Sequence, residues 1–152
     1  MKIVVVSGGF DPIHKGHVRM MIEAERLGDK LIVILNSDKF LDEKKKDKGG
    51  RFYPDIDERE EIVRWGIGER YGNGNEAVRC IDTDMSVCKT LEMIRKRFPD
   101  DEIFFANGGD RKDAADILEY QTCIDNNIKM VFNVGGGKIQ SSSWLISGKK
   151  EK

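Results

Sequence analysis

The chain has 152 residues and a formal net charge of −1, with 39% hydrophobic and 35% charged residues. This length favours a single domain with its own core, and the near-neutral charge argues against nucleic acid or an anionic membrane as a partner. No apolar run approaches the ~20 residues of a membrane helix, and the N-terminus lacks the pattern of a signal peptide.

The cysteines suggest a reducing compartment. Cys80, Cys88 and Cys123 are odd in number, widely spaced and free of any C-x-x-C pattern. Such cysteines are typical of reduced thiols that pack as small hydrophobic side chains. We therefore expect a cytoplasmic protein without disulfides.

Strand-like and helix-like segments alternate along the whole chain. Strands are expected at 2–7, 30–35, 76–81, 102–106 and 129–133, and helices at 15–27, 38–41, 57–65, 87–98, 112–126 and 141–146. Residues 42–54 carry charge without apolar periodicity, so we expect a mobile surface loop there. The alternation predicts the α/β class: a Rossmann-like, doubly wound, five-stranded parallel sheet with helices on both faces. One domain would span 1–147, with 148–152 as a polar C-terminal tail.

The first turn, GGFDPIHKGH at 8–17, joins the first strand to the first helix. The N–H groups and the dipole of a helix N-terminus suit an anion. His14 and His17 are the only histidines in the chain, and their i, i+3 spacing lets both face one ligand. Gly16 leaves room for a phosphate to approach the backbone. This pattern predicts a phosphate site, with incidental capping or surface histidines as the alternative, while zinc lacks a nearby third ligand.

Three glycine turns each follow an expected strand, at Gly8, Gly108 and Gly135. In open parallel sheets, ligands bind beyond the carboxyl ends of the strands, at the point where the strand order reverses. We therefore expect the three turns to meet at one edge of the sheet.

The first turn resembles the signature of the cytidylyltransferase-like nucleotidyltransferase superfamily, a small-residue turn followed by His-x-Gly-His. The resemblance covers nearly the whole chain, because LGDKLIV at 27–33, NSD at 36–38, Gly-Gly-Asp at 108–110 and the serines at 141–143 occur in the family's order. It implies transfer of a nucleoside monophosphate from ATP or CTP to a phosphorylated acceptor, with release of pyrophosphate and usually with Mg²⁺. The run at 27–38 looks most similar to the branches that act on heptose 1-phosphate and glycerol 3-phosphate.

The resemblance also implies roles for individual residues. His14, His17 and one lysine of the loop, assigned to Lys46, would be catalytic. Asp11, Lys44 and Arg59 would bind the acceptor, although an ion pair of Arg59 with Asp55 or Glu60 fits equally well. The nucleotide would be bound by Gly8, Gly9, Phe10, Asp11, His14, Gly16, His17, Gly108, Asp110, Ser141, Ser142 and Ser143.

The expected reaction is a direct displacement at the α-phosphorus of the triphosphate. The acceptor phosphate is ionised at pH 7, so catalysis requires positioning and charge stabilisation rather than a base. No protein-held metal is expected, because Mg²⁺ would bind phosphates and water. The alternatives are a coenzyme adenylyltransferase of flavin or pantetheine type and a nucleotide-binding module without catalysis. The choice between ATP and CTP stays open, and a homodimer is a further expectation from the family.

Overall fold

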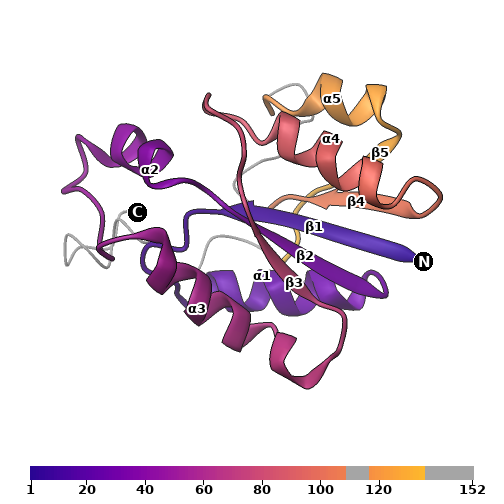
Figure 1. Cartoon of the computed structure of the whole chain (residues 1–152), viewed down its shortest axis with the longest axis horizontal. Helices are drawn as coiled ribbons and strands as arrows, with labels where there is room; N and C mark the ends of the chain where they lie inside the picture. The colour runs from indigo at the N-terminus through magenta and orange to yellow at the C-terminus, as the bar shows by residue number, and fades with distance from the viewer. Residues whose placement is uncertain (109–116, 136–152) are drawn as a thin grey trace.

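The computed structural model describes residues 1–108 and 117–135. Its strands form one parallel sheet in the order β3-β2-β1-β4-β5 (Figure 1). The strands are β1 (Lys2–Gly8), β2 (Lys30–Leu35), β3 (Glu76–Arg79), β4 (Glu102–Ala106) and β5 (Ile128–Val131). The helices are α1 (Lys15–Arg26), α2 (Asp38–Lys45), α3 (Ile56–Gly66), α4 (Cys88–Arg97) and α5 (Tyr120–Asp125), with a 3₁₀ turn at Glu69–Tyr71. Within these ranges, no helix combines the length and the apolar character needed to cross a membrane.

Both faces of the sheet are covered, which confirms the doubly wound prediction. In β1, Val4 and Val6 point to the face packed by α1 and α3, while Ile3 and Val5 point to the face packed by α4 and α5. All four side chains are fully buried. A central strand buried on both faces has no polar alternation, which is why β1 and β2 are continuous apolar runs.

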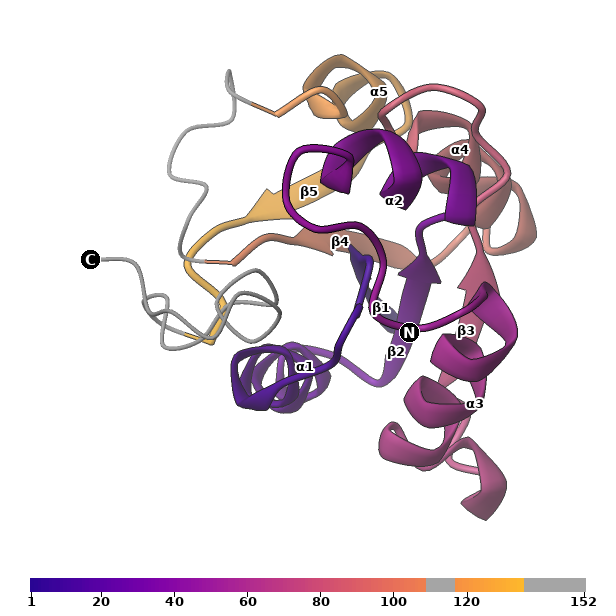
Figure 2. The same ribbon diagram turned by 90° about the vertical axis from the view of Figure 1, so that its left-hand side faces the viewer.

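The strand order reverses between β1 and β4, because β1 pairs with β2 on one side and with β4 on the other. Figure 2 shows α2, and the segment that leads from it to α3, lying across the carboxyl edge of the sheet. The first turn leaves β1 at this edge, and Asn107 and Gly108 leave β4 there. The switch-point rule therefore places the first two glycine turns together.

Helix α2 corrects the loop expected at 42–54, because the helix continues to Lys45 instead of ending at Leu41. Leu41 and Lys45 are both buried and stand four residues apart on one face of α2. Lys45 buries its aliphatic stem. The buried face of α2 therefore continues to Lys45, although a lysine does not show up as apolar in the sequence pattern.

The second half of the chain differs from expectation in its boundaries. Strand β5 begins one residue earlier than expected, and β3 ends at Arg79 rather than at 81. Residues 117–119 lie outside any helix, so α5 is shorter than the helix expected at 112–126. Residues 112–116, the expected helix at 141–146 and the tail at 148–152 lie outside the described residues.

Gly135, the third glycine turn, packs directly against α1. Its N–H donates to Glu23 Oε2 at 2.9 Å, and its φ of 85° lies in the left-handed region. A Cβ at this position would lie 2.9 Å from Met20 Cα. The chain after β5 therefore passes the helix that carries His14 at its N-cap and His17 in its first turn.

Gly135 and Gly74 form a matched pair that separates backbone strain from a steric clash. Gly74 has a φ of 86°, and a Cβ there would have no neighbour within 4 Å. Gly74→Ala should cost about 1 kcal/mol of unfolding free energy through the left-handed backbone, and Gly135→Ala should cost roughly 1–3 kcal/mol more through the contact with α1. Urea unfolding of the two variants measures the difference, and equal losses would contradict the packing described for Gly135.

Candidate active site

The backbone of the first turn requires small residues at its start. A Cβ on Gly9 would lie 2.6 Å from Leu41 Cδ2, and one on Gly8 would lie 2.9 Å from the Phe10 ring. Phe10 has a positive φ of 52° and is only 2% exposed. Its ring belongs to the core on the α1 side of the sheet, so any contact of Phe10 with a nucleotide would come from its backbone.

His14 and His17 cap α1 reciprocally. His14 Nδ1 accepts hydrogen bonds from the N–H groups of Gly16 (3.1 Å) and His17 (3.4 Å), and His17 Nδ1 accepts from the His14 N–H at 3.2 Å. The two rings stack, with centroids 3.7 Å apart and planes 17° apart. An Nδ1 atom that accepts a hydrogen bond carries no proton, so each neutral ring carries its proton on Nε2. The turn therefore presents two Nε2–H donors beside a helix N-terminus.

The surroundings of His17 keep its ring neutral. Burial is the largest cause, and the nearby His14, Lys45 and Lys44 add to it, lowering the pKa of His17 to about 3. Phe10 covers one side of the ring edge to face, with centroids 4.9 Å apart. At neutral pH, His17 is thus a hydrogen-bond donor and a weak base.

Asp11 is fully buried and holds a second segment of chain against the turn. Its Oδ2 accepts from the Phe52 N–H (2.7 Å) and its Oδ1 from the Tyr53 N–H (2.8 Å). Lys45 Nζ lies 3.2 Å from Oδ2 and also donates to the Asp11 carbonyl. Burial alone would raise the pKa of Asp11, but these backbone donors and Lys45 outweigh it and keep the pKa below its usual value. The carboxylate expected to contact substrates is thus engaged within the protein.

Arg59 makes neither of the surface ion pairs considered from the sequence. Its side chain is 1% exposed, and it donates to the Gly9 carbonyl at 2.8 Å and to Asp38 Oδ1 at 3.0 Å. Asp38 Oδ1 also pairs with Arg51 at 2.9 Å. Arg59 therefore holds the backbone of the turn at Gly9, and its guanidinium is engaged with Gly9 and Asp38.

Three consecutive lysines at the end of α2, Lys44, Lys45 and Lys46, have different surroundings. Lys45 is the buried one that faces Asp11, a position that sequence reasoning missed. Lys44 is exposed but close enough for its charge to lower the pKa of His17. Lys46 is exposed and pairs with Glu43 at 2.8 Å. The role assigned to Lys46 stays a prediction.

The turn after β4 is tied to the neighbouring strand. The Asn107 N–H donates to the Val131 carbonyl at 2.8 Å, and the Val134 N–H donates to the Asn107 carbonyl at 3.0 Å. This pairing holds Gly108 and Gly135 on adjacent segments. Asp110, Ser141, Ser142 and Ser143 lie outside the described residues, so their expected roles stay predictions.

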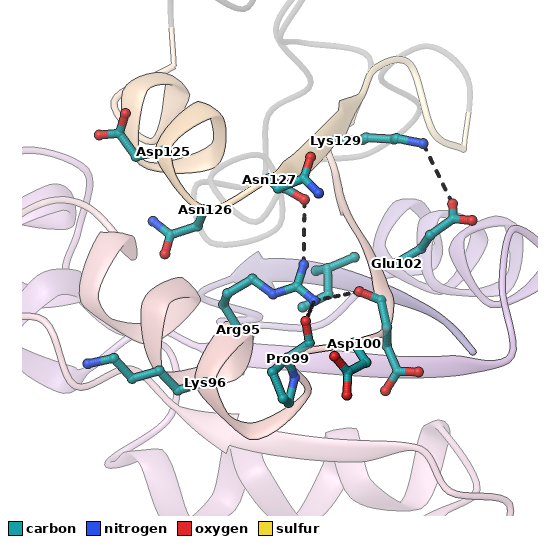
Figure 3. A pocket seen from close by; sticks show the side chains of 11 residues that line it. Arg95, Lys96, Pro99, Asp100, Glu102, Asp125, Asn126, Asn127 and Lys129 are labelled. Carbon is teal, nitrogen blue, oxygen red and sulfur yellow. Dashed lines mark hydrogen bonds and ion pairs between the residues drawn. The ribbon is translucent and has the colours of Figure 1, made fainter.

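A groove of about 580 Å³ lies at the opposite, amino edge of β4 and β5 (Figure 3). Its central cation, Arg95, donates to the carbonyls of Phe98 (2.7 Å) and Pro99 (3.2 Å), and Lys129 faces Glu102 across the rim at 3.7 Å. These groups close the end of α4 and are engaged with one another. The histidine turn is therefore the better candidate for chemistry.

The polar groups described at the histidine turn can be compared with the needs of a metal ion and of an anion. Across 1–108 and 117–135, no three His, Cys, Asp or Glu side chains are grouped so as to hold a metal ion. The site consists instead of neutral imidazole donors, backbone N–H groups and lysines. Such a set favours a ligand that carries negative oxygens.

Comparison with known proteins agrees with this chemistry. The family model described as cytidylyltransferase-like matches residues 5–133. The chain is 42% identical over 64 residues to the FAD synthase of Thermococcus sibiricus, covering 41% of each protein. It is 54% identical over 37 residues to the bifunctional protein HldE of Sodalis glossinidius, covering 24% of this chain and 8% of HldE. Each matched segment thus spans less than half of the relative.

Solved structures share the fold. A lipopolysaccharide core biosynthesis protein from Thermoplasma volcanium superposes with a TM-score of 0.62 at 24% identity, covering 87% of this chain and 95% of that one. A bifunctional NMN adenylyltransferase/ADP ribose pyrophosphatase from Francisella tularensis gives a TM-score of 0.69 at 16% identity, covering 97% and 41%. At these identities the likeness establishes the architecture alone.

The low pKa of His17 predicts a specific loss of stability in mild acid. Between pH 6.5 and about 3 the unfolded chain binds a proton at this histidine that the folded chain does not, so the unfolding free energy falls by up to about 1.4 kcal/mol per pH unit. Between pH 7 and 5.5 the wild type should lose about 1 kcal/mol more than His17→Asn, which has no titrating ring. Urea unfolding at both pH values measures this, and parallel losses would show that His17 titrates normally.

Proposed function

The chain belongs to the cytidylyltransferase-like family, and on that premise we propose that it is a nucleotidyltransferase. It would transfer a nucleoside monophosphate from ATP or CTP to a phosphorylated small molecule and release pyrophosphate. The observation that carries this proposal is the reciprocal cap of His14 and His17, which fixes both Nδ1 atoms on the backbone and places the proton of each neutral ring on Nε2.

In the proposed reaction, an oxygen of the acceptor phosphate attacks the α-phosphorus of the triphosphate. The new P–O bond forms as the bond from the α-phosphorus to the bridging oxygen breaks, and pyrophosphate leaves with that electron pair. The attacking oxygen is already ionised at pH 7, so the weakly basic His17 needs to remove no proton. The two Nε2–H donors and the N-terminus of α1 stabilise charge on the phosphate oxygens.

Magnesium is proposed to arrive with the triphosphate, whose charge it would neutralise. The carboxylate of the turn, Asp11, already accepts from Phe52, Tyr53 and Lys45. The ligands of the ion would then be phosphate oxygens and water, which is the usual arrangement for Mg²⁺ with nucleotides.

Two acceptor classes fit the family. A match to HldE relatives agrees with a sugar or polyol phosphate of the heptose 1-phosphate or glycerol 3-phosphate type. A match to FAD synthases agrees equally well with a coenzyme precursor, and it favours ATP as the donor. A binding module without catalysis would need no pair of fixed imidazole donors, and it would release no pyrophosphate with any acceptor.

Asparagine variants separate catalysis by the histidines from capping. Asn is a good N-cap, so His14→Asn and His17→Asn should retain an acceptor near Nδ1 and should keep the melting temperature close to that of the wild type. They lack the outer Nε2–H, so turnover should fall on the order of 100-fold or more, as for lost oxyanion donors.

Pyrophosphate release with ATP or CTP, Mg²⁺ and a panel of acceptors measures turnover for these variants. His14→Gln, whose amide reaches further than that of Asn, serves as a partial-rescue control. Full turnover in both Asn variants would reduce the histidines to caps and would sink the proposed mechanism.

Lys44 and Lys46 provide a second matched pair, because both are exposed lysines near the end of α2. The charge of Lys44 reaches His17, whereas Lys46 pairs with Glu43. Lys44→Met should therefore lower kcat/KM about tenfold through loss of one charged contact to the triphosphate, and Lys46→Met should change it by less than about twofold. The reverse result would establish Lys46 as the catalytic lysine.

A further inference from the structure

An exposed aromatic side chain, Phe52, belongs to a segment whose backbone is bonded to the histidine turn. Phe52 is 59% exposed, although its backbone N–H is fixed by Asp11 Oδ2 at 2.7 Å. Asp11 stands three residues before His14. Large apolar side chains on the surface are common, but the backbone of this one is anchored to a buried carboxylate of the candidate active site.

Both sequence neighbours of Phe52 are anchored as well. The Tyr53 N–H donates to Asp11 Oδ1 at 2.8 Å, and its phenol lies at the backbone of Ile13. On the other side, Arg51 donates to Asp42 at 2.7 Å and to the Pro54 carbonyl at 2.9 Å. The Phe52 ring meets the Tyr53 ring edge to face, with centroids 5.1 Å apart and planes 89° apart. Three successive residues are thus fixed while the ring of the central one remains exposed.

Among the described residues, the two charged side chains that anchor this segment, Asp11 and Arg51, already have partners. Asp11 is bonded to Lys45 and to two backbone N–H groups, and Arg51 is bonded to Asp38, Asp42 and Pro54. A polyol bound against Phe52 would find its hydroxyl groups without free partners among these anchors. A flat aromatic ring needs no hydrogen-bond partner at Phe52, because it binds through apolar area and ring stacking.

We propose that Phe52 is a specificity-determining residue that stacks on a planar heteroaromatic ring of the acceptor. This inference rests on the proposed function and narrows it: the acceptor would be a phosphate monoester attached to a flat aromatic group, not a sugar or polyol phosphate. Loss of a base stacked on an aromatic side chain should weaken acceptor binding on the order of tenfold or more.

The test compares acceptors and Phe52 variants in the full chain with ATP or CTP and Mg²⁺. Flavin mononucleotide and nicotinamide mononucleotide represent the flat-ring class, and glycerol 3-phosphate and a sugar 1-phosphate represent the other. With the wild type, kcat/KM for one of the two flat-ring acceptors should be at least about tenfold higher than kcat/KM for glycerol 3-phosphate or the sugar 1-phosphate. Phe52→Ala should raise the KM for that acceptor about tenfold, Phe52→Trp should restore it, and the KM for the triphosphate should not change.

Binding can be followed without turnover, because stacking on an aromatic side chain quenches flavin fluorescence. If flavin mononucleotide is the preferred acceptor, its titration with the wild type and with Phe52→Ala reports the stacking contact directly. If nicotinamide mononucleotide is preferred, the comparison of acceptor KM between the two proteins tests the contact instead. Tyr71→Ala is the matched control. Tyr71 is also an exposed aromatic residue (75% exposed), but it lies on the 3₁₀ turn after α3 and is neither part of the histidine turn nor bonded to Asp11.

The possible failures are distinguishable. Pyrophosphate release with glycerol 3-phosphate or the sugar phosphate, but with neither flat-ring acceptor, would overturn the role of Phe52 and leave the proposed function standing. An unchanged acceptor KM in Phe52→Ala, or a rise in the KM for the triphosphate instead, would also overturn it. Absence of pyrophosphate release with every acceptor would overturn both.

Discussion

The buried carboxylate of Asp11 is the interaction on which the candidate site depends. A charge taken out of water is stable only when its partners replace the lost hydration, and here two backbone N–H groups and Lys45 do so. The partners come from α2 and from the segment that leads to α3. The pairing therefore joins the histidine turn to residues that lie 34 to 42 positions further along the chain. Removal of either charge would leave the other buried without its ion-pair partner, so the contact specifies one arrangement of both segments.

A second constraint is that His14 and His17 cap the same helix end at which we propose that they act. Their Nδ1 atoms satisfy N–H groups that the first turn of α1 would otherwise leave unpaired. The same bonds select the tautomer that directs Nε2–H outward. Capping and catalysis are therefore not competing interpretations of His14 and His17, because the cap orients the donors. The i, i+3 spacing serves both purposes, since it is the spacing of N-cap and N3 in a capping box.

The sequence predicted the architecture well, because the patterns that specify it are local. Continuous apolar strands, glycine turns and alternating helices were sufficient to predict the doubly wound sheet. The roles of Lys45, Arg59 and Asp11 within the site could not be predicted, because each depends on a contact between segments far apart in the chain. Lys45 illustrates the difficulty: three adjacent lysines look equivalent until the helical face of Leu41 selects one for burial.

The residue that we propose to select the acceptor is constrained differently from the residues that hold the turn in place. The glycines and Arg59 act on the backbone of the turn, because a Cβ on Gly8 or Gly9 would lie within 3 Å of Phe10 or Leu41 and Arg59 donates to the Gly9 carbonyl. Asp11 holds Phe52 through its N–H, which every residue except proline supplies. Its side chain can therefore change without disturbing Asp11, so the position can vary with the acceptor while the transfer chemistry stays the same. Relatives that share this turn can accordingly differ in the molecule to which they transfer the nucleotide, and the acceptor has to be inferred from the exposed residues that surround the turn.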